Sequence, residues 1–448
     1  MSDIAIGVVC LATSLVLIQT GMHIGVALML LSFIGVWAIR GLDIAGRLLS
    51  SSAATSVATD AYAVIPLFVL MGLFVSSTNI GRDTFDVAAL LLRRIRGGLG
   101  IATVAANAVF AACTGTTIAS ASVFTKVVVP EMIRHGYTAK FSVGVVAGSS
   151  VLGMLIPPSI LFIIFGVIAN VSIADLFKSG IIPGILLAVA FCVTIFLLAT
   201  FRPGFVDANP QAAGAGYSGP LDRAPAWAVA LKVLPIVILV GTVLGGIYGG
   251  FLTPTEAGGV GALAAFLIAL ARREMTLKLF WNAALETGRV TAAIIFLLMA
   301  ATLYSQMLTV SGLPYAVGQW LESSGLSLLP ILLGYLAVVV ALGCFLDSVS
   351  IMLIVLPFVI PVFEGFGVNL IWFGLISVLA IEIGLLTPPL GIAVFVVRAN
   401  LDDQRITTWQ VFAGTGPMTL TMVLVLIICV LFPWLALALV GNADWNWW

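Results

Sequence analysis

Two short polar segments interrupt long apolar regions of this chain, and their side chains carry oxygen atoms of the kind that bind hard cations. The first is Thr114–Thr117, with the sequence Thr-Gly-Thr-Thr, in the apolar region 100–138. The second is Asp347–Ser350, with the sequence Asp-Ser-Val-Ser, in the apolar region 330–365. Hydroxyl, carboxylate and carbonyl oxygens are the ligands that small, hard cations prefer. These residue types therefore predict a site for a sodium-like cation at each segment.

An apolar helix that two prolines interrupt follows each polar segment. The first helix, 141–170, contains Gly153–Ser159, and the second, 369–398, contains Gly384–Pro389. Proline has no N–H group and clashes with the carbonyl group one turn earlier, so a Pro-Pro step breaks a helix. In a bilayer the freed backbone groups are tolerated only where protein, water or a ligand satisfies them. Paired breaks at matching positions in two halves predict the binding site of a transporter.

An offset of 231 residues relates the two halves of the chain. It joins Pro158 to Pro389 (389 − 158 = 231). The same offset joins Gly81 to Gly312, Cys113 to Cys344, Pro130 to Pro361, Gly136 to Gly367, Gly153 to Gly384 and Pro157 to Pro388. Three matched prolines out of 19 exceed what chance gives. We therefore predict an internal repeat that covers roughly residues 22–170 and 253–400.

The composition is that of an integral membrane protein. Hydrophobic residues make up 61% of the chain, charged residues make up 8%, and the mean hydropathy is +1.22. A soluble domain carries about 25% charged residues. The 19 basic residues balance the 19 acidic ones, so the net charge indicates no nucleic-acid partner. The five cysteines lie in apolar runs without metal-type spacing, and we interpret them as small buried hydrophobic residues.

The predicted fold is an all-α polytopic membrane protein built from two repeats. A span needs about 20 apolar residues, and the candidates are 4–19, 22–40, 61–79, 141–170, 179–201, 228–246, 254–272, 290–310, 369–398 and 414–439. The predicted units are an N-terminal span (1–21), a first repeat (22–202), a linker (203–227), a second half (228–413) and a C-terminal span and tail (414–448). The N-terminus lacks the basic segment of a signal peptide, so we expect its span to be retained.

The regions 100–138 and 330–365 are too long for one span and have polar centres, so they are predicted as re-entrant helical hairpins. Basic residues surround the first hairpin, whereas 312–330, before the second, contains no Lys or Arg. The positive-inside rule then places the two hairpins on opposite faces and makes the repeats inverted. Arg40, Arg47 and Lys178 fall on the outer side and count against this orientation.

Several segments between the spans are expected to lie at the membrane surface. Amphipathic stretches occur at 43–59, 82–97, 275–289 and 312–325. The linker contains Asn-Pro, Gly-Ala-Gly and Ser-Gly-Pro steps, which predict a flexible cytoplasmic connection. The tail Trp445–Trp448 fits an aromatic belt at the outer interface.

Ionisable residues within membrane segments are costly and usually functional. Asp347 lies at the second predicted hairpin tip, where a bound cation offsets its charge. Glu382 precedes the second break, and its sequence position fits a cation ligand, a proton carrier or a buried hydrogen-bonding group equally well. Lys126 is expected to extend its ammonium group toward the cytoplasm. Glu256, in Thr253–Glu256, is typical of a capped helix start.

The motifs of known enzymes give little support to a catalytic function. The sequence contains no His-Glu-x-x-His, no Gly-x-Ser-x-Gly and no Walker-type lysine loop. An intramembrane enzyme that uses Asp347 and Glu382 as paired carboxylates is a remote alternative, because nothing in their spacing requires it.

At these segments the sequence resembles the large membrane subunit of tripartite ATP-independent periplasmic (TRAP) transporters. Five elements carry the resemblance: Thr114–Ser120, Gly153–Ser159, Gly245–Glu256, Gly343–Asp347 and Glu382–Pro389. The first matches Ser-Gly-Ser-Ser-Ala-Ala-Thr with threonine in place of serine, which keeps the hydroxyl groups. Lys126 stands where a small residue is usual, and Ser348 stands where proline is common.

The resemblance implies a bacterial inner-membrane transporter that works with two partners, a small four-helix membrane subunit and a periplasmic substrate-binding protein. It also implies sodium-driven uptake of an organic acid, such as a dicarboxylate, and an elevator-like movement of a transport domain against a scaffold. Sodium sites are implied where each hairpin meets its broken helix. The orientation predicted from the basic residues places both termini in the periplasm.

We therefore predict the permease subunit of a sodium-coupled importer of a small carboxylate, without organic cofactors. The alternative is a stand-alone carboxylate carrier coupled to sodium or protons. The predicted cation-binding residues are Thr114, Gly115, Thr116, Thr117, Gly153, Ile156, Pro157, Asp347, Ser348, Gly384, Thr387 and Pro388. The predicted substrate-binding residues are Ser120, Pro158, Ser159, Ser350, Glu382 and Pro389.

Overall fold

The computed structural model describes residues 2–208 and 225–441, and these residues form helices and one isolated antiparallel bridge between Tyr137 and Asp207. The helices are α1 (Asp3–Gln19), α2 (Ile24–Arg40), α3 (Leu42–Ala58), η1 (Asp60–Ala63), α4 (Val64–Ser76), α5 (Ile80–Leu92), α6 (Gly98–Thr114), α7 (Thr117–Arg134), α8 (Ala139–Ser150), α9 (Leu152–Leu155), α10 (Ile160–Ala169), α11 (Ile173–Phe201), α12 (Pro203–Val206), α13 (Ala226–Tyr248), α14 (Pro254–Ala271), α15 (Leu277–Ser311), α16 (Leu313–Ser323), α17 (Leu328–Gly343), α18 (Ser348–Gly365), α19 (Leu370–Leu385), α20 (Ile392–Ala399), α21 (Thr408–Leu431) and α22 (Trp434–Leu437).

Each of the two long apolar regions folds as a helical hairpin. In the first, Gly115 adopts a left-handed conformation that ends α6, and Thr116 caps α7 by accepting a hydrogen bond from the Ala119 N–H at 3.3 Å. In the second, α17 ends at Gly343, and Asp347 caps α18 by accepting from the Ser350 N–H at 3.1 Å. Capping side chains satisfy N–H groups that a helix start leaves unpaired. The polar segments are thus the points where the chain reverses.

The two proline pairs lie in non-helical breaks. The first break separates α9 from α10, and Ser159 caps α10 by accepting from the Phe162 N–H at 3.4 Å. The second separates α19 from α20, where Gly391 has a positive φ of 53°. Both breaks therefore leave a new helix N-terminus inside a region that is otherwise apolar.

Several element boundaries differ from those predicted. The stretch 275–289 was expected to lie apart from the span 290–310, but α15 is one continuous helix, because no proline interrupts it after the Thr276 cap. The last long helix begins at Thr408 rather than 414, where Thr407 and Gln410 form a capping box, and it ends just before Pro433.

The linker 203–227 is also shorter at both ends than predicted. Its first residues form α12, and the Ala208 N–H donates to the Gly136 carbonyl at 2.8 Å. At the other end, α13 begins at Ala226. The predicted flexible part of the linker and the tail Trp445–Trp448 lie outside the described residues.

Long apolar helices dominate the described part of the chain. By length and composition, seven of its helices can cross a bilayer, or eight if the bent pair Leu42–Ser56 and Asp60–Ser76 counts as one span. The broken helix Ala139–Ala169 is among the seven, whereas α1, α2, α6, α17 and α19 are shorter apolar helices of 10–17 residues. A bundle of this kind is a multi-pass membrane fold.

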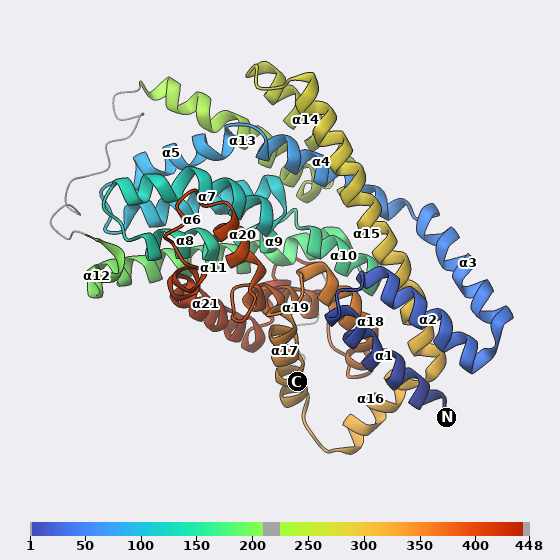
Figure 1. Ribbon diagram of the computed structural model, residues 1–448. Helices are drawn as coiled ribbons and strands as arrows, with labels where there is room; N and C mark the ends of the chain where they lie inside the picture. The colour runs from blue at the N-terminus through green and yellow to red at the C-terminus, as the bar shows by residue number, and fades with distance from the viewer. Residues whose placement is uncertain (1, 209–224, 442–448) are drawn as a thin grey trace.

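The hairpins and broken helices lie together, and the long α15 flanks them. Figure 1 shows α15 running along one side of the molecule, with α2 and α3 beside it. The helices α8 and α21 pack closely, and so do α17 and α19. Nearly all of α19 is buried, and the Trp372 indole N–H at its start donates to the Cys429 carbonyl at 2.8 Å. The helix α19, the first part of the second broken helix, therefore lies in the core of the fold.

Contact between α8 and α21 depends on two glycines. A Cβ atom on Gly414 would overlap the Lys140 carbonyl oxygen, and one on Gly144 would overlap the Gly414 backbone. Small residues allow membrane helices to approach this closely.

We expect Gly414→Ala to destabilise the protein by about 1–3 kcal/mol, because the overlap is with backbone atoms that cannot rotate away. Thermal unfolding of the purified chain measures this. Gly416→Ala is the matched control on the same helix, because a Cβ there meets nothing within 4 Å. An equal loss of stability in both variants would contradict the close contact.

A cluster of charged residues fastens α5 to α13 and α14. Lys232 lies 2.7 Å from Asp83 and 2.9 Å from Asp86, and Arg272 also pairs with Asp83. Glu274 then links Arg272, at 3.3 Å, to the side-chain amide of Asn79, at 3.0 Å. The Asp83 side chain is 7% exposed, so its charge depends on these partners.

Asp83→Asn is expected to lower the free energy of unfolding by about 1.5–3 kcal/mol, because it weakens bonds between charged groups and leaves two cations without a full counter-charge. The control is Glu286→Gln, which removes an exposed pair with Arg289 at 3.5 Å and should cost less than about 1 kcal/mol. Melting curves of the two variants, recorded side by side, test the difference. A larger loss in the control would show that the cluster does not hold α5.

Candidate functional site

Each hairpin tip contacts its own broken helix through backbone atoms. At the first junction, the Ile160 N–H donates to the Gly115 carbonyl at 3.4 Å. At the second junction, the N–H groups of Leu390 and Gly391 donate to the Cys344 carbonyl at 3.2 and 3.4 Å. The structure therefore brings together the tips and breaks whose residue types predicted the site.

Glycines make these contacts possible. A Cβ on Gly115 would lie 2.5 Å from the Pro158 carbonyl oxygen, and one on Gly153 would lie 2.6 Å from the Thr116 carbonyl oxygen. At the second junction, a Cβ on Gly384 would lie 2.5 Å from the Gly343 Cα. Gly115, Gly153 and Gly384 are all among the predicted cation-binding residues.

The predicted hydroxyl groups are mostly buried and hydrogen-bonded. Thr114 donates to the Phe110 carbonyl at 3.1 Å, Thr387 donates to the Ile383 carbonyl at 2.7 Å, and Ser159 donates to the Met154 carbonyl. A hydroxyl that donates its hydrogen still has lone pairs to offer a cation. The Ser120 hydroxyl is fully buried one turn after the first tip and has no hydrogen-bond partner among the described residues.

The Asp347 carboxylate caps its own helix. It accepts from the Ser350 N–H and also from the Ser350 hydroxyl, so both predicted residues act together at the second tip.

The two junctions differ in their access to solvent. Pro157 and Pro158 are buried at the first break, whereas Pro388 and Pro389 are exposed at the second. Ile156 is intermediate.

Glu382 joins the two hairpin tips. The Thr117 hydroxyl donates to one carboxylate oxygen at 2.8 Å, and the Ser348 hydroxyl donates to the other at 3.1 Å. The Glu382 side chain comes from α19 and is 1% exposed. The sequence singled out all three residues but gave no sign that they meet.

Two polar contacts near the site were missed by the sequence reasoning. The Ser122 hydroxyl on α7 donates to the Asn400 side-chain oxygen at 3.0 Å, which joins the first hairpin to the end of α20. Asn107 on α6 is fully buried and donates to the Ser149 hydroxyl at 2.5 Å, while its side-chain oxygen has no partner among the described residues. An asparagine inside an apolar helix is a signal that can be read from sequence.

Two other residues of the sequence analysis lie away from the junctions. The capped-start interpretation of Glu256 is confirmed, because the Thr253 N–H donates to it at 2.8 Å and its own N–H donates to the Thr253 hydroxyl at 3.3 Å. Lys126 is exposed on α7, one turn beyond Ser122.

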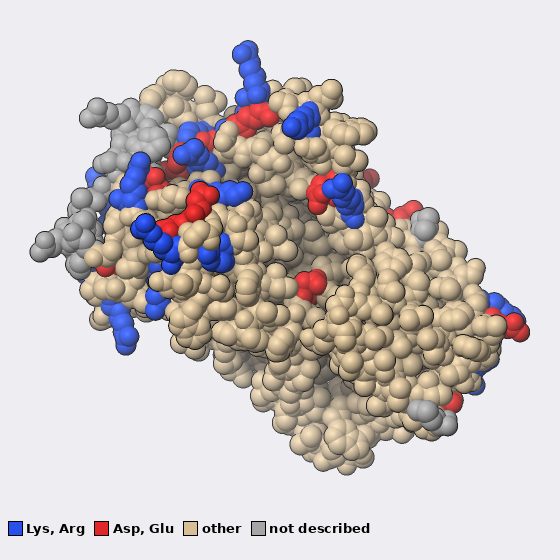
Figure 2. All heavy atoms as spheres, viewed as in Figure 1, with Lys and Arg blue, Asp and Glu red and all other residues tan. Residues whose placement is uncertain are grey.

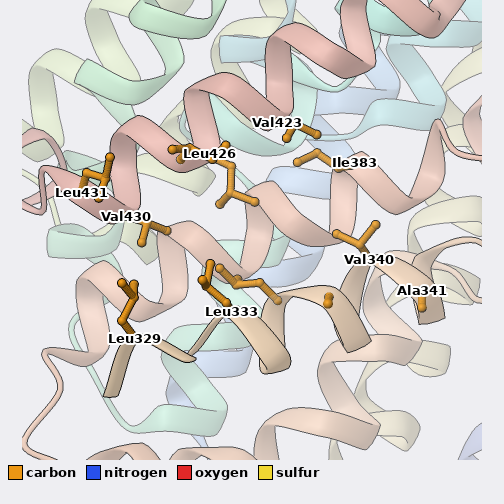
Figure 3. Close-up of a pocket in the computed structure, with 12 residues that line it drawn as sticks. Leu329, Leu333, Val340, Ala341, Ile383, Val423, Leu426, Val430 and Leu431 are labelled. Carbon is orange, nitrogen blue, oxygen red and sulfur yellow. The ribbon is translucent and has the colours of Figure 1, made fainter. Parts of the chain in front are cut away.

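A separate apolar pocket of about 620 Å³ lies between α17, α19 and α21. Figure 3 shows Leu329, Leu333 and Val340 facing Leu426 and Val430 across it. All of its lining residues are aliphatic. A pocket without hydrogen-bonding side chains does not fix the orientation of an acid, so this pocket is not the candidate site.

The comparison with protein families decides the class. The protein-family model described as "Tripartite ATP-independent periplasmic transporter, DctM component" matches residues 11–435. The chain belongs to this family. The resemblance seen in the sequence is thereby confirmed, and the chain is a multi-pass membrane protein of a transporter family, not an enzyme.

Relatives of the TRAP permease carry several substrate names. The chain is 34% identical over 336 residues, 75% of its length and 76% of the relative's, to the C4-dicarboxylate TRAP transporter large permease protein of Pseudomonas aeruginosa. It is 30% identical to the sialic acid TRAP transporter permease protein of Haemophilus influenzae, covering 82% of this chain and 58% of the relative. It is 28% identical to the isethionate TRAP transporter permease protein DctMQ of Oleidesulfovibrio alaskensis, over 89% and 62%.

A solved structure shows the same fold. The YdaH transporter of Alcanivorax borkumensis matches with a TM-score of 0.58 and 15% identity, over 89% of both chains. At this identity the likeness concerns the fold alone.

Gly115→Ala tests the first junction. We expect a loss of at least about 2 kcal/mol, because a left-handed alanine costs about 1–2 kcal/mol and its Cβ also meets the Pro158 carbonyl at 2.5 Å. Gly312→Ala is the matched control, since it has a similar φ of +71° but open space around it. If thermal unfolding shows that both variants lose the same stability, the tip at Gly115 is not in close contact with the break at Pro158.

Proposed function

We propose that this chain is the permease subunit of a sodium-coupled importer of a small organic acid. The observation that carries the proposal is the meeting of two hairpin tips with two broken helices at positions related by the sequence repeat. Both junctions supply hydroxyl and carbonyl oxygens in an apolar region, and the second adds the Asp347 carboxylate. This is the environment of a coupling-ion site in secondary transporters.

The cation sites lie at the two junctions in this proposal. At the first, Thr114–Thr117 faces the break from Gly153 to Pro157. At the second, Asp347 and Ser348 face the break from Gly384 to Pro388. The buried hydroxyls and the close backbone contacts described above support this assignment. A sodium ion bound there replaces water with protein oxygens and fixes the tip to the break.

The substrate lies between the tips. Four helices, α7, α10, α18 and α20, begin at or beside the junctions, and helix N-termini favour negative charge. The substrate-contacting residues we propose are Ser120, Pro158, Ser159, Ser350, Glu382 and Pro389. The relatives named for C4-dicarboxylates, sialic acid and isethionate support an organic acid as the substrate class.

The two halves form inverted repeats and move as an elevator in this proposal. The hairpins, the broken helices, α11 and α21 form the transport domain, and α2–α4 with α13–α15 form the scaffold, as the helix contacts support. Basic side chains gather over α5–α8 in Figure 2, which supports a cytoplasmic location for that end and periplasmic termini.

Two partners complete the importer. The family description names a tripartite periplasmic system, and the name of one relative, DctMQ, combines two components. We infer that this chain works with a small DctQ-type membrane subunit and a periplasmic binding protein, in a bacterial inner membrane.

A coupling alternative has its own support. Among the described residues, no Lys, Arg or His forms an ion pair with Glu382. A buried carboxylate without a counter-ion is suited to carry a proton, so proton coupling is the second candidate.

Melting temperatures in sodium and potassium chloride at equal ionic strength separate the two candidates. A bound ion stabilises the folded chain by about 2.7 kcal/mol at a hundredfold excess over Kd, so we expect a higher melting temperature in sodium. The sodium-specific rise should shrink in Thr116→Val and Asp347→Asn. It should persist in Thr125→Val, whose hydroxyl bonds only within α7.

The sodium-specific difference is the readout, because loss of a cap lowers stability in both salts. Equal melting temperatures in the two salts would exclude sodium coupling and favour proton coupling. Uptake of labelled acids by proteoliposomes, with and without the binding protein, separates the tripartite importer from a stand-alone carrier.

A further inference from the structure

Glu382 accepts from the same structural position in both hairpins. Thr117 and Ser348 are the first helical residues of α7 and α18, directly after the capping residues Thr116 and Asp347. They are separated by the repeat offset (348 − 117 = 231). Two equivalent hydroxyls therefore donate to opposite oxygens of a single carboxylate, at 2.8 and 3.1 Å.

The carboxylate itself has no counterpart in the first half. The offset places Val151 at the equivalent position (382 − 231 = 151), and Val151 is fully buried. The repeat thus supplies two donors and only one acceptor. If the carboxylate served only to bind each tip to its own broken helix, the repeat would have placed a carboxylate in both halves. Instead, a single carboxylate connects the two tips.

The surroundings make both hydrogen bonds costly to lose. Glu382 is 1% exposed, and its neighbours Ile381 and Ile383 are buried in the central helix α19. No Lys, Arg or His among the described residues forms an ion pair with it, so its charge depends on the two hydroxyls and on the positive ends of α7 and α18. If either tip moves away, one oxygen is left unpaired in an apolar region.

We propose that Glu382 is a positioning residue that couples the two cation sites. The inference rests on the proposed sodium coupling and adds a mechanism to it. A cation at one junction fixes that tip against its break, which holds one hydroxyl on Glu382. The carboxylate, kept in place, then favours the closed position of the other tip, where the second cation binds. Coupling between two sites is reciprocal, so either ion promotes binding of the other.

Binding of radioactive sodium to the purified full-length chain tests the coupling. For two coupled sites we expect a Hill coefficient that approaches about 2. Glu382→Leu, which fills the space without accepting hydrogen bonds, should still bind two ions per chain but with a Hill coefficient of about 1. Its half-saturating sodium concentration should rise by about 2- to 12-fold, which is the square root of the coupling factor of about 5 to 150 that such couplings span.

Single-tip variants distinguish coupling from direct coordination. Thr117→Val and Ser348→Ala should each lower the Hill coefficient to about 1, and the double variant should lower it no further, because one missing contact already uncouples the tips. A fall to one bound ion per chain in a single-tip variant is the loss expected of a cation ligand, and the test of coupling then depends on Glu382→Leu, which leaves the residues of both proposed cation sites intact. Thr125→Val is the matched control on α7 and should keep the wild-type Hill coefficient.

The possible results separate the two proposals. A wild-type Hill coefficient of 1, or full cooperativity in Glu382→Leu, would overturn the coupling role while leaving the sodium sites in place. If excess potassium displaces all of the bound sodium, the chain has no sodium-specific site, and both proposals are overturned. Cooperative binding that disappears in Glu382→Leu, with two ions still bound, is the result expected.

Discussion

The structure depends on one constraint: a helix that breaks inside an apolar region must find partners for its backbone groups. The Pro-Pro steps break two helices, and the hairpin tips supply the partners. The carbonyl of Gly115 accepts from Ile160, and the carbonyl of Cys344 accepts from Leu390. Because the tips must come this close, glycines occupy the contact points. The polar side chains of the tips are thereby brought to the broken ends.

The same arrangement brings together groups that favour opposite charges. Helix starts at the junctions favour anions, while the hydroxyl and carboxylate oxygens of the tips favour cations. Within residues 2–208 and 225–441, Glu382 is the one carboxylate to which both tips donate hydrogen bonds. The proposed site for an acid and a cation therefore depends on broken helices and hairpin tips that lie side by side.

The sequence was most informative where local chemistry decides the structure. Prolines mark the breaks, and Thr116 and Asp347 mark the turns, because capping and helix termination depend on nearby residues. The continuity of α15 was not foreseen, because the amphipathic stretch 275–289 and the apolar span 290–310 were predicted as separate elements. The bridge from Thr117 to Glu382 spans 265 residues. Such a contact depends on tertiary packing, which no single sequence encodes in a readable pattern.

The length of α15 has a mechanical consequence. Its 35 residues extend over about 52 Å at 1.5 Å per residue, whereas the hydrocarbon core of a bilayer is about 30 Å thick. The helix must therefore tilt strongly or extend past the lipid tails, and its amphipathic first part is suited to lie among the headgroups. Because α15 contacts both α2 and the second hairpin helix α18, its tilt links the lipid to the second hairpin. A thicker or thinner bilayer therefore changes the angle at which this helix supports α18.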